Sequence, residues 1–312
     1  MATRTEIEQH YDTVGALHAL RLEEEQGGFP DYTCALFDGD FSKSLDQGQE
    51  DKHTWIFNGL GLGRDLSGKC VLDIGCGWGP TLNAARKRGG KGIGLTLSPG
   101  QVAYCTARGL DARLKDYKDL KDDELTEFDG IISIGAFEHF CSIEELLEGK
   151  QEDIYRKFFS ICAHRLPMGG RLYLQTMTWG IEVPDPRRFS LDAPANSPEA
   201  ILARLTYLYP GSWLPSGLEQ IVDCAKDTFS FISNKNGRLD YLETLKRWSD
   251  STRNLWKPQV LPRTLWHAVP LAFHILTNRN SWIQWQSIKR GDQTSCFARE
   301  IMSHQRIFFE KK

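Results

Sequence analysis

The sequence has no closely spaced pair of cysteines, no long apolar run and no large excess of either charge sign. Its eight cysteines are scattered over 312 residues without a CxxC pair, which argues against a zinc site and a disulfide framework. We expect most of them to be buried free thiols. No stretch reaches the roughly 18 apolar residues of a membrane-spanning helix, and no basic start precedes an apolar segment. A cytoplasmic protein without a metal is therefore expected.

The charge balance excludes one class of partner. The chain has 38 basic and 41 acidic residues and a formal net charge of −3. Nucleic-acid binding needs a basic surplus, so no nucleic-acid partner is expected. The composition, 40% hydrophobic and 25% charged, is that of a globular protein with a sizeable core. A disordered or fibrous chain is excluded.

Strand-like and helical patterns alternate in the middle of the chain. Apolar runs at 70–74, 92–97, 130–134 and 172–177 predict strands. Between them, Pro80 and Ser98-Pro99 are helix starts, and Gly89-Gly90 and Gly109 are helix stops. This alternation is typical of a parallel sheet with crossover helices. Two more helices are predicted at 201–209 and 218–225, and two edge strands at 228–232 and 306–310.

The positions of the predicted helices and strands divide the chain into three zones within one structural domain. Residues 1–65 are predicted to be a helical segment that covers a ligand site, with a helix starting after Ser42 or Ser44. Residues 66–178 form the α/β core. Residues 179–312 contain a substrate cap followed by the last strands of the sheet.

The most informative segment is Val71-Leu72-Asp73-Ile74-Gly75-Cys76-Gly77-Trp78-Gly79, a buried strand that runs into a glycine turn. A dinucleotide site would need a third glycine or alanine where this chain has Pro80. It would also need an acid about twenty residues on, where the chain reads Gly94-Leu95-Thr96-Leu97-Ser98. Asp73 suits a ligand with an ammonium and a sulfonium group, which indicates S-adenosylmethionine. The alternative is that Asp73 only holds the turn backbone.

Five strings carry a resemblance to a known family. DIGCGWG, GLTLSPGQ and SIGAFEHF, with YTCALF upstream and DYLETLKRW downstream, resemble the cyclopropane fatty acid synthase family, which includes the mycolic acid cyclopropane synthases and methyltransferases. The similarity runs from about His10-Tyr11-Asp12 to residue 250 and is weaker across roughly 251–295. The resemblance implies a class I methyltransferase Rossmann-like α/β fold: a mostly parallel seven-stranded sheet with helices on both faces and a helical substrate cap.

The resemblance also implies the cofactor-binding residues. Tyr32 and Thr33 would hold S-adenosylmethionine from upstream, Thr96 and Gln101 would reach the ribose, and Asp116 and Tyr117 would lie near the adenine. The full implied set is Tyr32, Thr33, Asp73, Gly75, Cys76, Gly77, Trp78, Gly79, Thr96, Gln101, Asp116, Tyr117 and Ile134.

The family reaction needs little from the protein except a dry site and a base. An alkene attacks the sulfonium methyl, and the resulting cation must be stabilised and lose a proton. Glu138 follows the 130–134 strand at the ligand-binding edge of the sheet and is our first candidate for the functional carboxylate. By resemblance Tyr241 and Cys34 join it in holding a bicarbonate ion that acts as the base. Gln175 stands where the family usually has a histidine, which puts ring closure in more doubt than methyl transfer.

Each of these residues has an ordinary structural alternative. Glu138 could cap a helix, because acids favour first turns. Tyr241 could be a core residue with its hydroxyl at the surface. His139 is interpreted as structural. Cys34 is expected to be protonated near neutral pH and to act through its position.

The substrate is less defined. Five tryptophans between 248 and 285, together with Leu261, Leu265, Val269, Leu271, Ile275 and Leu276, could roof a long apolar chain or form a small core under a helical cap. Three prolines, Pro258, Pro262 and Pro270, argue against one continuous helix there.

We therefore predict a methyltransferase that transfers a methyl or methylene group to the double bond of an unsaturated fatty acyl chain on a lipid or carrier, with peripheral membrane contact. Plant coclaurine-type N-methyltransferases resemble the same family, so a C- or N-methyltransferase of a small molecule or amine is the alternative. A pseudoenzyme that only binds the cofactor is a third reading, which the intact glycine turn and Glu138 disfavour.

Overall fold

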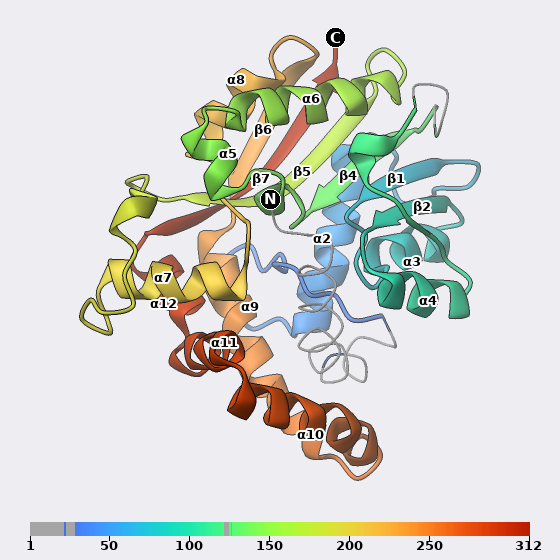
Figure 1. The fold of residues 1–312 in the computed structure, drawn as a ribbon. Helices are drawn as coiled ribbons and strands as arrows, with labels where there is room; N and C mark the ends of the chain where they lie inside the picture. Colours follow the sequence, from blue (N-terminus) through green and yellow to red (C-terminus); the bar gives the residue numbers. More distant parts are fainter. Residues whose placement is uncertain (1–21, 23–28, 122–124, 126) are drawn as a thin grey trace.

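A seven-stranded mixed sheet forms the centre of the molecule (Figure 1). The computed structural model describes residue 22, residues 29–121, residue 125 and residues 127–312; the predicted start of the family similarity at residues 10–12 lies outside them. The spatial strand order is β3-β2-β1-β4-β5-β7-β6. The strands are β1 Cys70–Ile74, β2 Lys91–Thr96, β3 Asp111–Leu114, β4 Gly130–Ile134, β5 Arg171–Trp179, β6 Phe229–Asn236 and β7 Met302–Lys311.

The first five strands are parallel, and only β7 runs antiparallel to its neighbours β5 and β6. This confirms the predicted class I methyltransferase fold. Six of the seven strands were predicted, several of them too short. Sequence reasoning missed β3, whose four residues, Asp-Ala-Arg-Leu, include two charges and no apolar run. β5 and β7 extend beyond the predicted bounds because they pair over nine residues.

Local capping signals place several helices where the sequence predicted them. Ser44 caps α2 through a capping box with Gln47, and Ser98 caps α4. Pro80 opens α3. The helices are α2 Leu45–Gly59, α3 Pro80–Lys87, α4 Pro99–Ala107, α5 Ile143–Leu147, α6 Gln151–His164, α7 Pro198–Leu208, α8 Leu218–Ala225, α9 Arg238–Ser251, α10 Leu261–Thr277, α11 Arg279–Arg290 and α12 Asp292–Ala298.

Helices cover both faces of the sheet. On one face, Phe158 and Phe159 of α6 and Ile221 of α8 pack against the strands. On the other face, Phe57 of α2 and Ala85 of α3 do the same. Because both faces are covered, the central strands are apolar on both sides, which is typical of parallel sheets.

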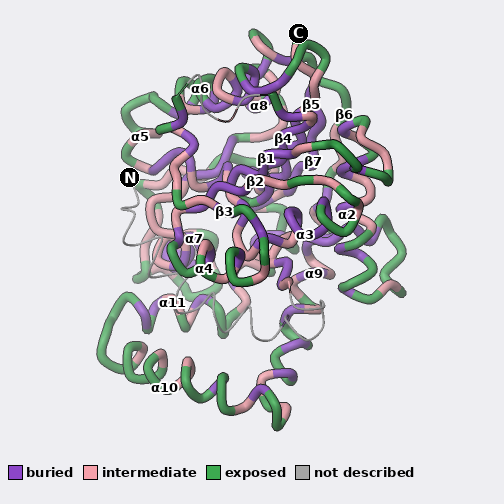
Figure 2. The backbone as a smooth tube through the Cα atoms, turned by 90° about the vertical axis from the view of Figure 1, so that its right-hand side faces the viewer, coloured by how far each residue is buried: buried purple, intermediate pink, exposed green. Residues whose placement is uncertain are grey.

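A helical cap stands beside the carboxyl ends of the strands and is tied together by a buried ion pair. Arg204 of α7 forms two hydrogen bonds with Asp292 of α12, at 2.6 and 2.9 Å. In Figure 2 the residues of α10 are mostly exposed and lie at the end of the cap furthest from the sheet. Across the part of the chain that the structure describes, no helix is both long and apolar enough to cross a bilayer.

One prediction for the cap is confirmed: residues 248–285 do not form one continuous helix, because α9, a 3₁₀ turn at Thr252–Trp256, α10 and α11 follow one another there. Pro270 itself does not break a helix, since it lies inside the 17-residue helix α10. Of the two alternatives for the tryptophans, the small core is not formed: Trp248 is buried, but Trp256 and Trp266 are more than 70% exposed, and Trp282 and Trp285 of α11 are exposed as well. The expectation for the cysteines is confirmed, since all eight are free thiols and seven are buried.

Candidate active site

A cavity of about 280 Å³ opens at the carboxyl ends of β1, β2, β4 and β5, where open α/β sheets place their ligands. It brings together residues from segments that lie far apart in the sequence. Of the seventeen residues predicted for the site, sixteen line this cavity: Tyr32, Thr33, Cys34, Asp73, Gly75, Cys76, Gly77, Trp78, Thr96, Gln101, Asp116, Tyr117, Ile134, Glu138, Gln175 and Tyr241. Gly79 is the exception.

The glycine turn has the backbone geometry that a closely approaching ligand requires. Gly75 has a φ of 89°, and a β-carbon there would lie only 2.5 Å from the β-carbon of Ala136. Gly77 has a φ of 53° and open space at the same position. At Gly79 a β-carbon would strike Leu110 instead, so this glycine allows packing behind the turn rather than forming the cavity wall.

Asp73, the second-last residue of β1, is a buried carboxyl group with one oxygen that lacks a hydrogen-bond partner. Its Oδ1 atom is buried and has no hydrogen-bond partner. Burial raises the pKa of Asp73 to about 7, against a smaller lowering by the Thr81 side chain. A cation placed beside this carboxylate would supply the missing partner. This favours the ligand role of Asp73 over the alternative of a residue that merely ties down the turn.

The two sets of residues predicted for ribose and adenine lie on the same wall. The Thr96 hydroxyl donates to Oε1 of Gln101 at 2.5 Å, which fixes the two side chains relative to each other. Asp116 accepts a hydrogen bond from the backbone N–H of Lys118 and caps a short 3₁₀ turn. The Tyr117 ring packs against Phe140, with ring centroids 4.4 Å apart.

A buried charged cluster holds the upstream loop over the cavity. Lys52 of α2 donates to Oδ2 of Asp31 at 2.6 Å and to the hydroxyl of Thr33 at 2.5 Å. Burial alone would raise the pKa of Asp31, but the Lys52 ammonium and the His53 ring outweigh it and hold that pKa well below its usual range. The cluster fixes the loop that carries Thr33 and Cys34.

Glu138 stands on the 3₁₀ turn Phe137–His139 after β4 and does not cap a helix. Its Oε1 atom accepts a hydrogen bond of 2.7 Å from the backbone N–H of Met177 on β5. Its Oε2 atom is buried and unpartnered. Burial raises the pKa of Glu138 to about 7, partly offset by the Met177 hydrogen bond. A carboxyl with such a pKa can exchange a proton near neutral pH.

Tyr241 and Cys34 line the same cavity as Glu138. Tyr241 is buried, so its hydroxyl is not a surface group. Its ring packs edge-on against Trp248. The Trp248 ring in turn stacks on the ring of Tyr32, with the two centroids 4.2 Å apart. Burial raises the pKa of Cys34 to about 11, which agrees with the expectation of a protonated thiol. Arg306 of β7 fixes its position by donating to the Cys34 sulfur at 3.1 Å.

Gln175 of β5 is held by two hydrogen bonds. Its Nε2 atom donates to the backbone carbonyl of Cys34 at 3.3 Å, and its Oε1 atom accepts from the hydroxyl of Tyr173 at 2.8 Å. One N–H of the amide is left for a ligand. The side chain therefore links the upstream loop to the sheet, and an amide cannot take up a proton.

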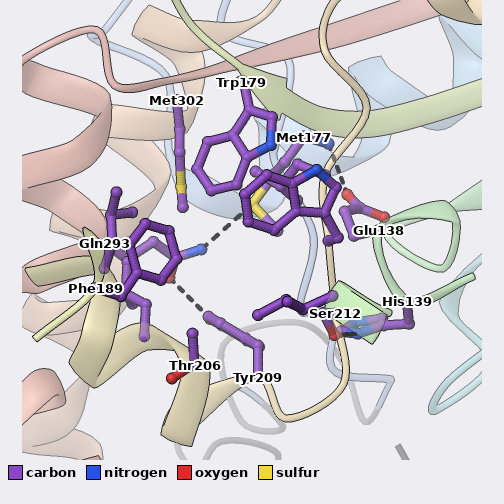
Figure 3. A pocket seen from close by; sticks show the side chains of 15 residues that line it. Glu138, His139, Met177, Trp179, Phe189, Thr206, Tyr209, Ser212, Gln293 and Met302 are labelled. Carbon is purple, nitrogen blue, oxygen red and sulfur yellow. Dashed lines mark hydrogen bonds between the residues drawn. The ribbon is translucent and has the colours of Figure 1, made fainter. Parts of the chain in front are cut away.

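A second, apolar pocket adjoins the 280 Å³ cavity (Figure 3). Glu138, His139, Met177 and Tyr209 line both spaces. Figure 3 shows Trp179, Met302 and Phe189 around the apolar side, with Glu138 and His139 at one edge. Its further walls come from α5, α7, α12 and the loop before α8: Ile143, Leu202, Leu205, Thr206, Ser212, Trp213, Leu214 and Gln293.

Comparison with known proteins decides the family. The family model for mycolic acid cyclopropane synthetase matches residues 1–260. Cyclopropane mycolic acid synthase 2 of Mycobacterium leprae is 32% identical over 263 residues, which cover 78% of each chain. The chain belongs to the mycolic acid cyclopropane synthetase family. It is an S-adenosylmethionine-dependent methyltransferase of cyclopropane synthase type, and S-adenosylmethionine is its cofactor.

Solved structures agree on the fold. Mycolic acid cyclopropane synthase CmaA1, complexed with SAH and CTAB, superposes with a TM-score of 0.72 at 22% identity over all of this chain and 99% of the other. Coclaurine N-methyltransferase, bound to N-methylheliamine and SAH, gives a TM-score of 0.63 at 18% identity over 97% of this chain and 88% of the other. At these identities the likeness concerns the fold alone, so it does not separate lipid from amine substrates.

Sequence reasoning missed several residues of the site. His304 of β7 lines the same cavity as the predicted residues, its ring centroid lies 5.1 Å from that of Tyr241, and its Nδ1 atom is buried without a partner. Lys52 and the apolar wall residue Trp213 were also missed. No motif contains them: β7 is more than 60 residues downstream of Tyr241, and only the pairing of β7 with β5 brings His304 opposite Met177.

Proposed function

We propose that this family member transfers a one-carbon group from S-adenosylmethionine to the double bond of an unsaturated fatty acyl chain. The observation that carries the proposal is the position of Glu138, which lines both the cofactor cavity and the apolar pocket. The methyl donor on one side and an acyl chain on the other would then meet beside a carboxyl group. The wall of Trp179, Phe189 and Trp213 excludes water from a cationic intermediate and offers it aromatic faces.

The names of the relatives support the same acceptor. Besides the mycolic acid synthases, a probable fatty acid methyltransferase of Pseudomonas putida is 37% identical over 142 residues, which cover 43% of this chain and 34% of the relative. The acceptor of this chain is accordingly proposed to be an acyl lipid or an acyl group on a carrier. The eight free thiols support a cytoplasmic location, which subcellular fractionation tests.

The residues around Glu138 leave a place for bicarbonate. The Oε2 atom of Glu138 is unpartnered, Tyr241 and Cys34 line the same cavity, and Gln175 retains one N–H. We propose that these four side chains hold the ion, which would serve as a proton acceptor. The neutral form of Glu138 near pH 7 would allow an anion beside it without two adjacent negative charges.

We propose the same division of labour along the chain as the sequence predicted. Residues 1–65 cover the cofactor site, residues 66–178 bind the cofactor, and residues 179–312 supply the substrate cap and the last strands. The upstream loop at Thr33 and Cys34, which lines the cavity, supports the first part.

A single labelling experiment tests the acceptor. Purified protein is given methyl-labelled S-adenosylmethionine with unsaturated acyl lipids in one set of reactions and a panel of amines in another. Label in the lipid supports the proposal. Label in amines alone would favour the small-molecule alternative, which the coclaurine N-methyltransferase fold also allows. NMR of the lipid product then distinguishes a cyclopropane ring from a methyl branch.

A further inference from the structure

The distal end of the cap carries an apolar surface that the site does not use. Helix α10 has five large hydrophobic side chains that are 48–78% exposed. The 3.6-residue helical period places them within about 100° of arc, so they form one continuous stripe. They are Leu265, Trp266, Val269, Phe273 and Leu276, and we call them the α10 stripe. A soluble surface seldom exposes so many large apolar side chains side by side.

The stripe is not the inner face of the helix. A different side of α10, at Leu261, Thr264, Leu271 and Ile275, is buried or half-buried toward the rest of the cap. Thr264 anchors that side by donating to the backbone carbonyl of Leu255 at 2.9 Å. The helix thus holds its position through one face and presents the stripe outward, as Figure 2 shows for the exposed residues of α10.

The positive charge of the segment that carries the stripe indicates which kind of partner the stripe would bind. Residues 251–291 contain six basic side chains, Arg253, Lys257, Arg263, Arg279, Lys289 and Arg290, and no acidic one. Because the whole chain has a net charge of −3, the remaining residues sum to −9. The segment that carries the exposed apolar stripe is therefore basic, although the chain as a whole is acidic. A second copy of the chain docked through the same surface would bring like charges together.

We propose that the α10 stripe and the surrounding basic residues dock the protein on an anionic lipid bilayer. An interfacial helix combines an apolar face of Trp, Phe and Leu with basic residues, and it lies in the plane of the headgroups. Exposed tryptophans, here Trp256, Trp266, Trp282 and Trp285, suit that interface. Residues 261–290 lie beyond the part of the chain that the family model matches.

This inference deepens the proposed function, because it places the acyl pocket close to a source of lipid. Helix α11 joins the docking surface to α7 through a hydrogen bond of 2.8 Å from Gln284 to the backbone carbonyl of Tyr207. Leu202 and Leu205 of the same α7, and Tyr209 directly after it, line the apolar pocket. Docking through α10 would therefore hold that pocket at the membrane without any helix crossing it.

Vesicle flotation with the full-length protein tests the docking. Phosphatidylcholine vesicles are compared with vesicles that also contain phosphatidylglycerol, at low and high salt. We expect binding to the anionic vesicles that weakens with salt. The double variant Trp266→Ser, Phe273→Ser should weaken it by about tenfold or more, because two aromatic side chains no longer enter the interface. Circular dichroism checks that each variant is folded.

The matched control is Leu147→Ser, Met168→Ser, which removes two exposed apolar side chains far from α10 and should leave binding unchanged. Failure of the wild type to float with anionic vesicles, or equal losses in both double variants, would overturn the docking proposal. So would light scattering that shows a dimer disrupted by Trp266→Ser, Phe273→Ser. Methyl transfer to detergent-dispersed acyl substrate needs no bilayer, so it reports on the proposed function separately.

Discussion

Binding of S-adenosylmethionine is expected to expel a proton from Asp73. Burial raises the pKa of this carboxyl to about 7 in the ligand-free cavity, and its Oδ1 atom has no partner. The ammonium and sulfonium groups of the cofactor favour the charged carboxylate. Because the free site is protonated below pH 7 and the bound site is not, affinity falls as the pH drops through 7.

The size of the effect follows from the pKa. If the bound carboxylate stays ionised, the dissociation constant should rise about fivefold between pH 7 and pH 6, and about sixteenfold between pH 7 and pH 5.5. Calorimetry in buffers of different ionisation enthalpy should detect release of about 0.5 proton at pH 7 and about 0.9 at pH 6. Measurements stay at or below pH 7 because the amino group of the ligand titrates near 8.

Two variants assign the proton. Asp73→Asn should bind the cofactor more weakly at pH 7 and lose most of the pH dependence. Glu138→Gln removes the other carboxyl in the cavity whose pKa is raised to about 7, and it should keep the pH dependence. An affinity of the wild type that is flat from pH 5.5 to 7, or proton release that survives in Asp73→Asn, would refute this reasoning.

Three further outcomes are expected. Glu138→Gln and Tyr241→Phe should both lower kcat, and Glu138→Gln should lower it by about 100-fold or more. Neither variant should change the Kd of the cofactor by more than about twofold. Single-turnover kinetics measures the rate, and calorimetry measures the Kd. Gly75→Ala should weaken cofactor binding by about tenfold or more, whereas Gly77→Ala, where φ is also positive but the space is open, should weaken it less. Arg204→Met should lower the free energy of unfolding in urea by about 3–5 kcal/mol, because it leaves a buried carboxylate unpaired; a loss below 1 kcal/mol would contradict that view of the cap.

The glycine turn and the helix starts were readable from the sequence because their causes are local. Ser44 and Ser98 accept hydrogen bonds from backbone groups three residues away, and Pro80 fixes its own φ. Sequence motifs also predicted seventeen site residues, and sixteen of them line one cavity. Most of these motifs end strands of the parallel part of the sheet, and the carboxyl ends of such strands meet at one edge. The residues at 32–34 and Tyr241 reach that edge from the upstream loop and from α9.

Other features depended on contacts between distant segments. The strand β3 has no apolar pattern of its own and forms because β2 offers it a paired edge. His304 enters the cavity only through the pairing of β7 with β5. The tryptophans of the cap look alike in the sequence, yet Trp248 is buried and Trp266 is exposed.

The sequence by itself determined the family, the order of the core elements and the glycine turn after β1, since short-range backbone preferences and motifs specify them. Tertiary structure alone decided that Asp73 and Glu138 each have a buried oxygen without a hydrogen-bond partner. It also decided that the apolar pocket borders Glu138 and which face of α10 is exposed to solvent. Those properties depend on which groups exclude water from one another. Exclusion of water is settled by packing among residues that are remote in the chain.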